Sequence, residues 1–456
     1  MKIPVRPPSQ SELLRHLLAQ PEGDRKFDKL FSSPGPGPAP DGKYRHWDTF
    51  RQLPTPDGVT AEERWFQVKL ARRALYRTIA LRDLQGQPFR YALVNPVLEL
   101  LHTIDRDASG TIQIAEQVAN PASRDRYLVS SLVEEAITSS QLEGAGTTRE
   151  VAKAMLREGR PPRDRGERMI ANNFAAMQWL LEGRDTPLTP DVVFAVQRTL
   201  TEGTLDDESA AGRFRRDEEE IVIGDDTGQV LHRPPRAAEL PARLALMCEF
   251  ANGDANSGEF VHPVVRAILL HFWLAYDHPF VDGNGRTARA LFYWCMARSG
   301  YWLSEYVSIS RILRQARGQY LRSYLYTETD ENDATYFLLD QLRVLRRGID
   351  ELHAWLGRKA REQRRAESLA RNVAALRGTL NERQLALLGH ALRHPDATYT
   401  LESHRRSHAV SYQTARTDML ALAEARLLDQ QKRGKAFIFT VPNDLEGRLS
   451  GSTRRT

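Results

Sequence analysis

Residues 262–277, which read HPVVRAILLHFWLAYD, are apolar on almost every face of a helix. A helix at the surface of a protein keeps one polar face toward water, so a helix that is apolar all round must be enclosed by other segments of the chain. The sequence therefore predicts a buried central helix with further helices packed around it. A helix held in this way would also fix the position of the side chains that follow it.

The chain has 456 residues, which leaves room for about three domains of ordinary size. Lys and Arg number 64 and Asp and Glu 59, so the formal charge of +5 permits an acidic partner without requiring one. Cys248 and Cys295 stand far apart, which argues against a disulfide framework or a zinc knuckle. The first ten residues lack the apolar core of a signal peptide, and no apolar run reaches about 18 residues. We therefore expect a soluble, cytoplasmic protein with no membrane partner.

The first three quarters of the chain divide into three expected regions. A stretch rich in Pro and Gly cannot sustain a helix, so residues 1–44 are expected to be an N-terminal segment and linker. Residues 45–120 show a helical pattern and are expected to form an accessory helical region. Residues 121–345 contain several helical stretches and one β-like segment, EEEIVIGDDTGQV, with a hairpin turn at Asp-Asp-Thr-Gly. The sequence thus predicts a mainly α fold with one small β-hairpin.

The last quarter of the chain predicts a separate small domain. Residues 346–376, rich in Arg, Ala, Leu and Glu, are expected to form a connecting helix. Residues 377–445 show three helical patterns followed by two short strands, an order similar to that of a winged helix. Residues 446–456 are expected to be a basic tail.

Polar residues in this C-terminal domain leave two functions open. The third helix and the wing carry side chains that could face a groove of DNA: Ser411, Gln413, Arg416, Thr417, Lys432, Arg433 and Lys435. Winged helices also recognise proteins, and a few basic residues on a hairpin are usually only solvated. DNA is therefore one expected partner among others.

The segment after the central helix, residues 278–289, reads HPFVDGNGRTAR. His278 stands at the helix exit, and an ordinary histidine pKa near 6.5 suits a general base at neutral pH. Gly283 and Gly285 allow positive φ angles and close approach of a ligand to the backbone. Because a helix begins at this turn, several backbone N–H groups and the positive end of a helix dipole point to one place. This arrangement is a natural seat for the phosphates of a nucleotide.

Charged side chains in the same segment support a phosphate site. Asp282 is a carboxylate suited to Mg²⁺, and Arg286 and Arg289 lie one helical turn apart on one face. A lone histidine or a bare Gly-Asn-Gly turn would more often be structural, but the combination favours a functional site. The spacing of His262 and His271 from His278 matches no helical pair of metal ligands, so these two are expected to be core histidines.

The same twelve residues resemble the signature of the Fic family, HxFx[DE]GNGRxxR, at every defining position. The resemblance implies a mostly helical enzyme that transfers AMP from ATP to a Tyr, Thr or Ser hydroxyl of a target protein and releases pyrophosphate. It implies that His278 is the base, that Asp282 binds Mg²⁺ and that Phe280 anchors the loop in the core. It further implies that the α- and β-phosphates are held by Gly283, Asn284, Gly285 and Arg286, and the γ-phosphate by Arg289.

Upstream, residues 139–144 read SSQLEG and match the inhibitory pattern of the same family, [ST]xxxE[GN]. Ser139 and Glu143 are four residues apart and would share a helix face, so that the hydroxyl could orient the carboxylate. Gly144 suits a helix end. By resemblance, Glu143 lies on an inhibitory helix around residues 128–144 and pairs with Arg289, in competition with the γ-phosphate. The alternative is an ordinary exposed glutamate near a helix end.

Two further segments resemble the parts of the family that cover the nucleotide. The predicted hairpin resembles the flap, which would place Ile221, Val222, Ile223 and Gly224 over the nucleotide and beside the backbone of the target. The segment GQYLRSYLYTETDENDATYF resembles the stretch that closes the adenine pocket, with Tyr320 as the contact to the base. Core packing of Tyr320 is the alternative. Thr327 stands where some relatives have asparagine, which leaves the adenine contacts open.

The main hypothesis is an autoinhibited adenylyltransferase that uses ATP and Mg²⁺ and modifies a target protein, with self-modification and a homodimer as further expectations. A winged-helix regulator whose Fic domain only senses a nucleotide is an alternative of a different class. Removal of AMP from a modified protein is a third, because a glutamate at this place could position water.

Overall fold

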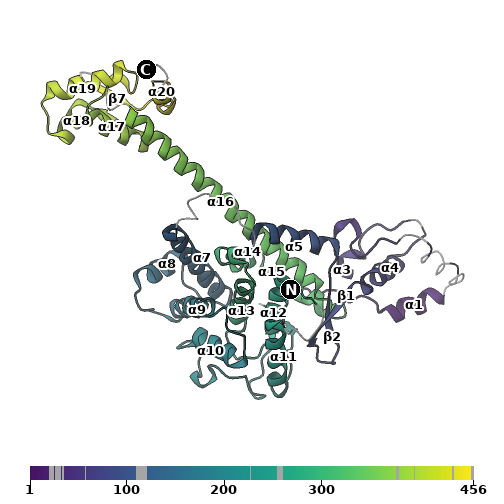
Figure 1. The fold of residues 1–456 in the computed structure, drawn as a ribbon. Helices are drawn as coiled ribbons and strands as arrows, with labels where there is room; N and C mark the ends of the chain where they lie inside the picture. Colours follow the sequence, from purple (N-terminus) through teal and green to yellow (C-terminus); the bar gives the residue numbers. More distant parts are fainter. Residues whose placement is uncertain are drawn as a thin grey trace. The chain divides into compact units, whose positions relative to one another are not determined.

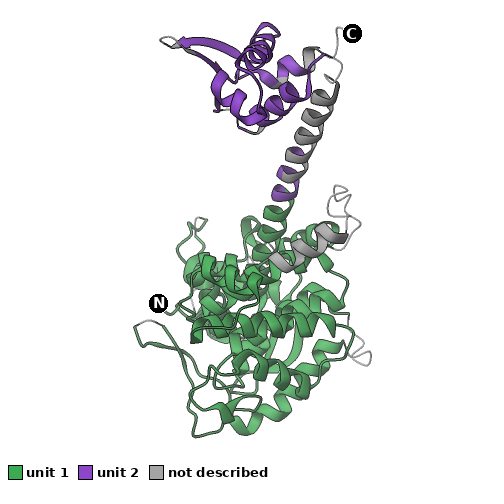
Figure 2. Cartoon of the chain, turned by 90° about the vertical axis from the view of Figure 1, so that its left-hand side faces the viewer, with its two compact units in different colours: residues 1–353 green, residues 354–456 purple. Residues whose placement is uncertain are grey.

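Helices make up most of the chain in the computed structural model (Figure 1), which confirms the predicted mainly α fold. The structure describes residues 1–19, 25, 32, 35–56, 58–108, 121–225, 227–253, 260–375, 379–394, 396–433 and 436–452. The chain divides into two compact units, Met1–His353 and Ala354–Thr456 (Figure 2). None of the helices among these residues is long and apolar enough to cross a membrane.

The apolar segment forms α12 (Pro263–Asp277), whose side chains are almost all buried. The predicted central helix is therefore confirmed. It begins after His262, whose ring accepts a hydrogen bond from the backbone N–H of Val264, and ends at His278. Six residues later the chain enters α13 (Asn284–Arg298), which packs against α12 and is just as fully buried. The loop between these two helices is thus held at both ends by the core of the first unit.

Further helices surround this pair (Figure 1). Polar N-cap residues start several of them; Asp164 and Thr189, for example, accept hydrogen bonds from the first turns of α9 and α10. The helices packed against α12, α13 or each other are α7 (Pro121–Leu142), α9 (Arg165–Glu182), α10 (Pro190–Thr201), α11 (Leu240–Asn252) and α14 (Ile309–Gln315). The remaining helical segments of this region are α8 (Arg149–Glu158), α15 (Arg317–Thr329), η2 (Glu208–Ala210), η3 (Ala237–Glu239) and η5 (Trp302–Tyr306).

The N-terminal region begins with a short helix, as expected, and contains a hairpin where only helices were expected. The helix α1 (Gln10–Leu18) packs on α4 (Ala61–Arg73), where Leu13 joins a buried cluster with Trp47 and Trp65. The other helical segments here are η1 (Pro40–Gly42), α3 (Trp47–Phe50) and α5 (Asn95–Ala108). The N-terminal segment is therefore part of the first unit and not a separate tail.

An antiparallel hairpin, β1 (Tyr76–Arg82) with β2 (Pro88–Ala92), replaces the helix expected in this region. The prediction was wrong because the first strand alternates buried Ile79 and Leu81 with exposed neighbours, which is the period of a strand. Gly86 has a φ of 76° in the turn, and Asp83 accepts hydrogen bonds from the backbone of Gln85 and Gln87. These local bonds favour a turn over a continuous helix.

A buried cluster of charged and aromatic residues joins this N-terminal region to the segment after α15. Lys69 and Arg72 on α4 are 2% and 0% exposed, and Nζ of Lys69 lies 2.7 Å from Oδ1 of Asp330. The Tyr336 hydroxyl donates to the other oxygen of Asp330 at 2.7 Å. The segment just after the C-terminal end of α15 is therefore held in place by side chains of α4, which lie about 260 positions earlier in the sequence.

The predicted small hairpin is present and consists of β3 (Ile223–Gly224) and β4 (Val230–His232). Asp225, Thr227 and Gly228 form its turn, and the Asp225 carboxylate accepts from the backbone N–H of Thr227. In the second unit, the three-stranded sheet has the order β5-β7-β6. Its elements are α17 (Glu382–Arg393), β5 (Thr398–Thr400), α18 (Leu401–His408), α19 (Tyr412–Glu424), β6 (Asp429–Arg433), β7 (Ala436–Thr440) and α20 (Leu445–Ser452).

The second unit has the three helices and two strands that the sequence predicts, with two additions. One is the short strand β5; the other is α20, where a basic tail was expected. Leu445 and Leu449 are four residues apart, so they share one face of α20, and both are buried in the core of this unit. Burial of this face stabilises a helix in a segment that was expected to be only a charged tail. The connecting helix is the end of α16 (Thr335–Ala375), which begins earlier than expected.

Candidate active site

His278 has the αL backbone conformation at the end of α12, with φ 45° and ψ 56°. Its backbone N–H donates to the carbonyl of Leu274, and its carbonyl accepts from Nε of Arg215 at 2.9 Å. Nδ1 lies 3.3 Å from the carbonyl oxygen of Ala275. Because a carbonyl only accepts, Nδ1 carries the hydrogen and Nε2 keeps its lone pair. Burial lowers the pKa of the imidazole to about 4, so His278 is a neutral base at physiological pH.

The loop after His278 is closed by the side chain of Asn284. Its Oδ1 accepts from the backbone N–H of Phe280 at 2.9 Å, and its Nδ2 donates to the Phe280 carbonyl at 2.8 Å. The Phe280 ring is fully buried, as the sequence predicts. Asn284 was expected to hold a phosphate, but both ends of its amide are used within the loop. The side chain therefore holds the loop in shape, and its second Nδ2 hydrogen and the backbone N–H are the donors left for a ligand.

The Glu143 carboxylate meets Arg289 on α13, with Oε1 accepting from the guanidinium at 2.8 Å. Burial raises the pKa of the Glu143 carboxyl, but Arg289 outweighs burial and holds the pKa below its ordinary value. The contact that the sequence resemblance implies between these two residues is therefore present, and Glu143 is ionised in it. Gly144, with a φ of 95°, ends the turn after α7 as expected.

Ser139 contacts Arg289 and not Glu143. Its hydroxyl accepts from Nε of Arg289 at 2.8 Å, and its carbonyl accepts from Nη2 at 3.1 Å. The sequence indicates that the Ser139 hydroxyl could orient the Glu143 carboxylate; in the structure α7 ends at Leu142 and the hydroxyl bonds to Arg289. Ser139 and Glu143 instead hold the same guanidinium from two sides.

Gly285, in the first turn of α13, lies directly under the Glu143 carboxylate. A Cβ at this position would collide with Oε1 of Glu143 and lie 3.0 Å from Nη1 of Arg289. The Glu143 carboxylate therefore lies over the first turn of α13 and is paired with Arg289. A phosphate oxygen would prefer the same place, because the start of a helix and a guanidinium both attract anions.

Arg286 is fully buried and holds the loop from below. Its Nη1 donates to the carbonyl of Leu200 at 2.8 Å, and its Nη2 lies 3.3 Å from Oδ2 of Asp282. Nε of Arg286 is buried without a hydrogen-bond partner in the described part of the chain. Burial lowers the pKa of this guanidinium below its ordinary value. Arg286 thus fixes the loop through its bond to the carbonyl of Leu200, and its positive charge lies next to the Gly283–Gly285 turn.

Asp282 is the carboxylate beside the same turn, and its side chain is 36% exposed. One exposed carboxylate fits Mg²⁺, which takes its other ligands from phosphates and water. No group of three or more His, Cys, Asp or Glu side chains is arranged to hold a metal among the described residues. His271 is fully buried and contacts the Tyr320 hydroxyl at 2.9 Å, as expected for a core histidine.

A cavity of about 140 Å³ adjoins His278, Gly285, Arg289 and Glu143. The rest of its lining is mostly apolar and aromatic and consists of Ile223, Leu231, His232, Ala275, Tyr276, Tyr320, Leu321, Tyr324, Leu325 and Glu328. Of the four flap residues expected over the nucleotide, only Ile223 lines this cavity, and Val222 is 40% exposed. Val222 is exposed between the half-buried Ile221 and Ile223, which is the alternation of an extended chain, and Gly224 has no side chain to contribute.

Three residues of the site have no counterpart in the sequence-based expectations. Gln197 on α10 donates to the carbonyl of Asp282, Arg215 donates to the carbonyl of His278, and His232 on the flap bonds to the carbonyl of Tyr276. Each contacts backbone of α12 or of the loop from a distant segment of the chain. No local pattern marks such residues, although Arg215 stands in the AGRFRR segment just before the flap.

Comparison with known proteins assigns this region to a family. Residues 187–296 match the sequence profile described as "Fic/DOC family". "Protein adenylyltransferase Fic" from Drosophila willistoni is 36% identical over 90 residues, which are 20% of this chain and 16% of that protein. The protein of the same name from Drosophila melanogaster is 37% identical over 90 residues, with the same coverage. The chain thus matches about a sixth of the length of these relatives.

Among solved structures, a Fic family protein from Desulfovibrio desulfuricans G20 is similar in fold. It has a TM-score of 0.50 and 19% sequence identity, and the similarity covers 77% of this chain and 98% of that one. At this level of identity the similarity concerns the fold alone.

Proposed function

We propose that this chain acts as a member of the Fic family and transfers AMP from ATP to a hydroxyl group of a protein. The observation that carries the proposal is the meeting of His278, the start of α13 and Arg289 around one cavity whose remaining lining is mostly apolar and aromatic. A base, an anion seat and an apolar pocket in this order suit a nucleotide with its phosphates at the loop. The relatives named as protein adenylyltransferases support the same activity.

In the proposed reaction, Nε2 of His278 takes the proton of a Tyr, Thr or Ser hydroxyl on the target. The hydroxyl oxygen attacks the α-phosphorus of ATP, the bond to the β-phosphate oxygen breaks, and pyrophosphate leaves. The hydrogen bond from Nδ1 to the Ala275 carbonyl keeps the lone pair of Nε2 available for this step. Positioning and neutralisation of charge would supply most of the rate, as in other transfers from phosphorus.

The phosphates would lie over Gly285, where backbone N–H groups at the start of α13 and Arg289 attract anions. Asp282 would hold Mg²⁺, whose chemistry is to neutralise charge on the departing phosphates. The buried Arg286 would add to the positive potential from beneath, while Asn284 keeps the loop in shape through Phe280. These roles rest on the geometry of the loop and on its resemblance to the family signature.

Autoinhibition by Glu143 is part of the proposal. Its carboxylate lies against Gly285 and neutralises Arg289, so it would compete with the phosphate that Arg289 attracts. ATP could then bind only with its phosphates displaced from the seat, out of line for attack on the α-phosphorus.

The test uses the full chain with Glu143→Gly and ATP that carries a radiolabel in either the α- or the γ-phosphate, with and without added cell lysate. Label in the chain itself or in a lysate protein, from the α-position only, would support AMP transfer. Label from the γ-position would point to phosphate transfer, and no label from either would contradict the proposal. His278→Ala in the same background should abolish labelling while ATP binding persists. Removal of AMP would be detected as loss of label from a pre-labelled protein.

DNA binding by the second unit is a second candidate, supported by one observation. On α19 the exposed side chains include Gln413, Arg416 and Thr417, and the first acidic residue exposed on this helix is Glu424, at its end. A helix face with Gln and Arg suits the edges of bases in a major groove. A mobility-shift assay of the full chain with random duplex DNA tests it, and a shift that Arg416→Ala leaves unchanged would contradict a role for this face.

A further inference from the structure

The described residues that line the active-site cavity include two carboxylates, and the one that does not pair with Arg289 is that of Glu328. It stands at the end of α15, next to the fully buried Thr327. The loop, Arg289 and the start of α13 attract phosphates, so the base of a bound nucleotide would use the rest of this lining, which includes Glu328. Apolar and aromatic side chains are sufficient to enclose the ring of a nucleotide base. A carboxylate in the same lining would add a hydrogen-bond acceptor for a polar group of that base.

Glu328 is held by the flap residue His232. Nε2 of His232 lies 2.8 Å from the carbonyl oxygen of Tyr276, and Nδ1 lies 2.9 Å from Oε2 of Glu328. The carbonyl can only accept, so Nε2 carries a hydrogen; the carboxylate also accepts, so Nδ1 carries one as well. Burial lowers the pKa of His232, but Glu328 outweighs burial and the net shift is upward. The two residues therefore form an imidazolium–carboxylate pair between the flap and α15.

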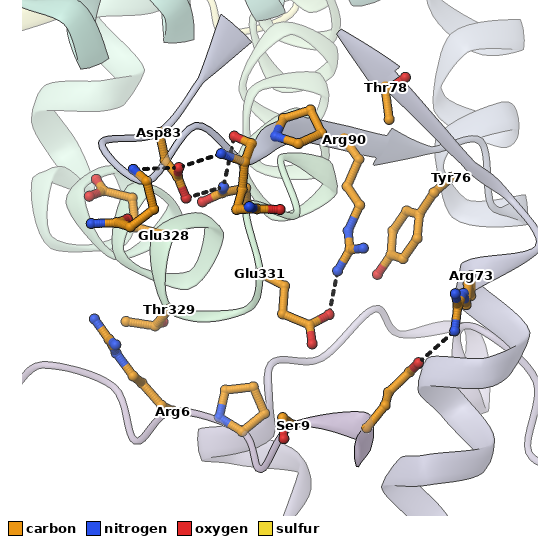
Figure 3. Close-up of a pocket in the computed structure, with 16 residues that line it drawn as sticks. Arg6, Ser9, Arg73, Tyr76, Thr78, Asp83, Arg90, Glu328, Thr329 and Glu331 are labelled. Carbon is orange, nitrogen blue, oxygen red and sulfur yellow. Dashed lines mark hydrogen bonds and ion pairs between the residues drawn. The ribbon is translucent and has the colours of Figure 1, made fainter. Parts of the chain in front are cut away.

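This pair leaves one oxygen of Glu328 free. Oε1 makes no hydrogen bond within the part of the chain that the structure describes, and the side chain is 24% exposed. Glu328 also borders a second, polar cavity of about 660 Å³, and Figure 3 draws the residues that line it. Water can therefore reach the carboxylate from the side of the second cavity.

The hydroxyl groups of Thr327, Tyr320 and Tyr324, which lie in or beside this lining, are already engaged. The Thr327 hydroxyl donates to the carbonyl of Ser323 at 3.0 Å and is fully buried, so it cannot reach a base. The Tyr320 hydroxyl lies 2.9 Å from Nε2 of His271 and 3.1 Å from the Tyr324 hydroxyl. Tyr320 and Tyr324 thus offer ring faces for stacking, and Glu328 offers a hydrogen-bond acceptor.

We propose that Glu328, oriented by His232, is a specificity-determining residue that accepts a hydrogen bond from the 6-amino group of adenine. An ionised carboxylate has no hydrogen to donate, so it repels the 6-oxo group of hypoxanthine or guanine. The inference rests on the proposed function, because it assumes that a nucleotide occupies this cavity. It concerns the choice of base and not the transfer step.

The experiment compares binding of ATP and ITP, which differ at position 6 of the base, to the full chain with Glu143→Gly. Competition against a fluorescent ATP analogue gives both affinities. We expect ATP to bind about 10-fold to 100-fold more tightly than ITP, the range for a hydrogen bond to a charged group. Glu328→Gln should reduce this preference to within about threefold, because the amide of Gln can donate to a 6-oxo group.

Two further variants separate base recognition from a structural role. His232→Ala should lower the ATP-to-ITP preference in the same direction, since His232 acts as a positioning residue through Glu328. Glu331→Gln, on the second cavity only, is the matched control and should leave the preference unchanged. Equal affinities of ATP and ITP for the parent chain, or a preference that survives Glu328→Gln, would overturn the inference.

These outcomes are distinct from failure of the proposed function. A chain that prefers ATP through Glu328 but transfers no label from its α-phosphate would support the base contact and contradict AMP transfer. A chain that transfers AMP with its preference unchanged by Glu328→Gln would contradict the base contact alone.

Discussion

Glu143 and Arg289 are 146 positions apart in the sequence, and their side chains form an ion pair of 2.8 Å at the start of α13. Ser139 binds the same guanidinium through its hydroxyl and its carbonyl. The end of α7 therefore supplies three acceptors to one arginine of the candidate active site. A phosphate that uses this arginine must replace one of them, and the Glu143 carboxylate is the acceptor that is partly exposed.

Removal of Glu143 should strengthen ATP binding and raise AMP transfer. A hydrogen bond to a charged group contributes about 1.5–3 kcal/mol, so Glu143→Gly should tighten ATP binding by roughly 10-fold to 100-fold. Isothermal titration calorimetry and transfer of label from the α-phosphate measure the two effects. Glu150→Ala, which changes an exposed glutamate on α8, is the control and should alter neither. Unchanged affinity and transfer in Glu143→Gly would contradict the proposed inhibition.

A methyl group on Gly285 should block the phosphate seat even when Glu143 is absent. Gly285 has helical backbone geometry, so alanine there is compatible with the fold, yet its Cβ would lie 3.0 Å from Nη1 of Arg289. In the Glu143→Gly background, we expect Gly285→Ala to weaken ATP binding by about tenfold or more. Gly318→Ala, at a helix start with open space around it, is the matched control. Full ATP affinity in the double variant would place the phosphates elsewhere.

The loop could be predicted because its chemistry lies within twelve consecutive residues. Central helix, glycine turn and helix start follow one another, so local patterns contain both the scaffold and the site. The pairing of Glu143 with Arg289 was accessible only through resemblance to a known family. Nothing in the two segments by themselves indicates that they meet.

The remaining parts of the site depend on contacts that form only in the folded chain. His232 on β4 and Glu328 on α15 form a hydrogen bond although they are 96 positions apart in the sequence, so no local pattern indicates the contact. Asn284 looked like a phosphate ligand in the sequence, but the loop geometry uses its amide internally. The β1–β2 hairpin was missed because a segment with helix-forming residues also has the alternation of a strand, and packing decides between them.

The low pKa of His278 predicts how activity depends on pH. Burial favours the neutral imidazole and lowers its pKa to about 4, so the base is available above that value and is lost only as the pH falls through it. An unperturbed histidine would lose activity near pH 6.5. Nitrogen-detected NMR of selectively labelled histidine in the free chain should give a midpoint near 4 and a hydrogen on Nδ1. A midpoint near the ordinary value would show that the ring is solvated and that the base is not held as described.

The buried pair of Lys69 and Asp330 should be important for the stability of the first unit. Both side chains are almost completely buried, and Nζ lies 2.7 Å from Oδ1. Asp330→Ala would leave Lys69 and the neighbouring Arg72 as buried cations without this carboxylate, a change that typically destabilises a protein by about 3–5 kcal/mol. Chemical denaturation of the full chain, followed by circular dichroism, measures the free energy of unfolding.

Glu331→Ala is the matched control for this pair, because Glu331 also contacts Lys69, at 3.2 Å, but is 43% exposed. Exposed ion pairs contribute about 1 kcal/mol or less, so we expect a small change. If both variants lose equally little stability, water must reach the Asp330 side chain, and the N-terminal region would not be anchored to the end of α15 by charge. A large loss confined to Asp330→Ala would identify burial, and not charge alone, as the reason that this contact matters.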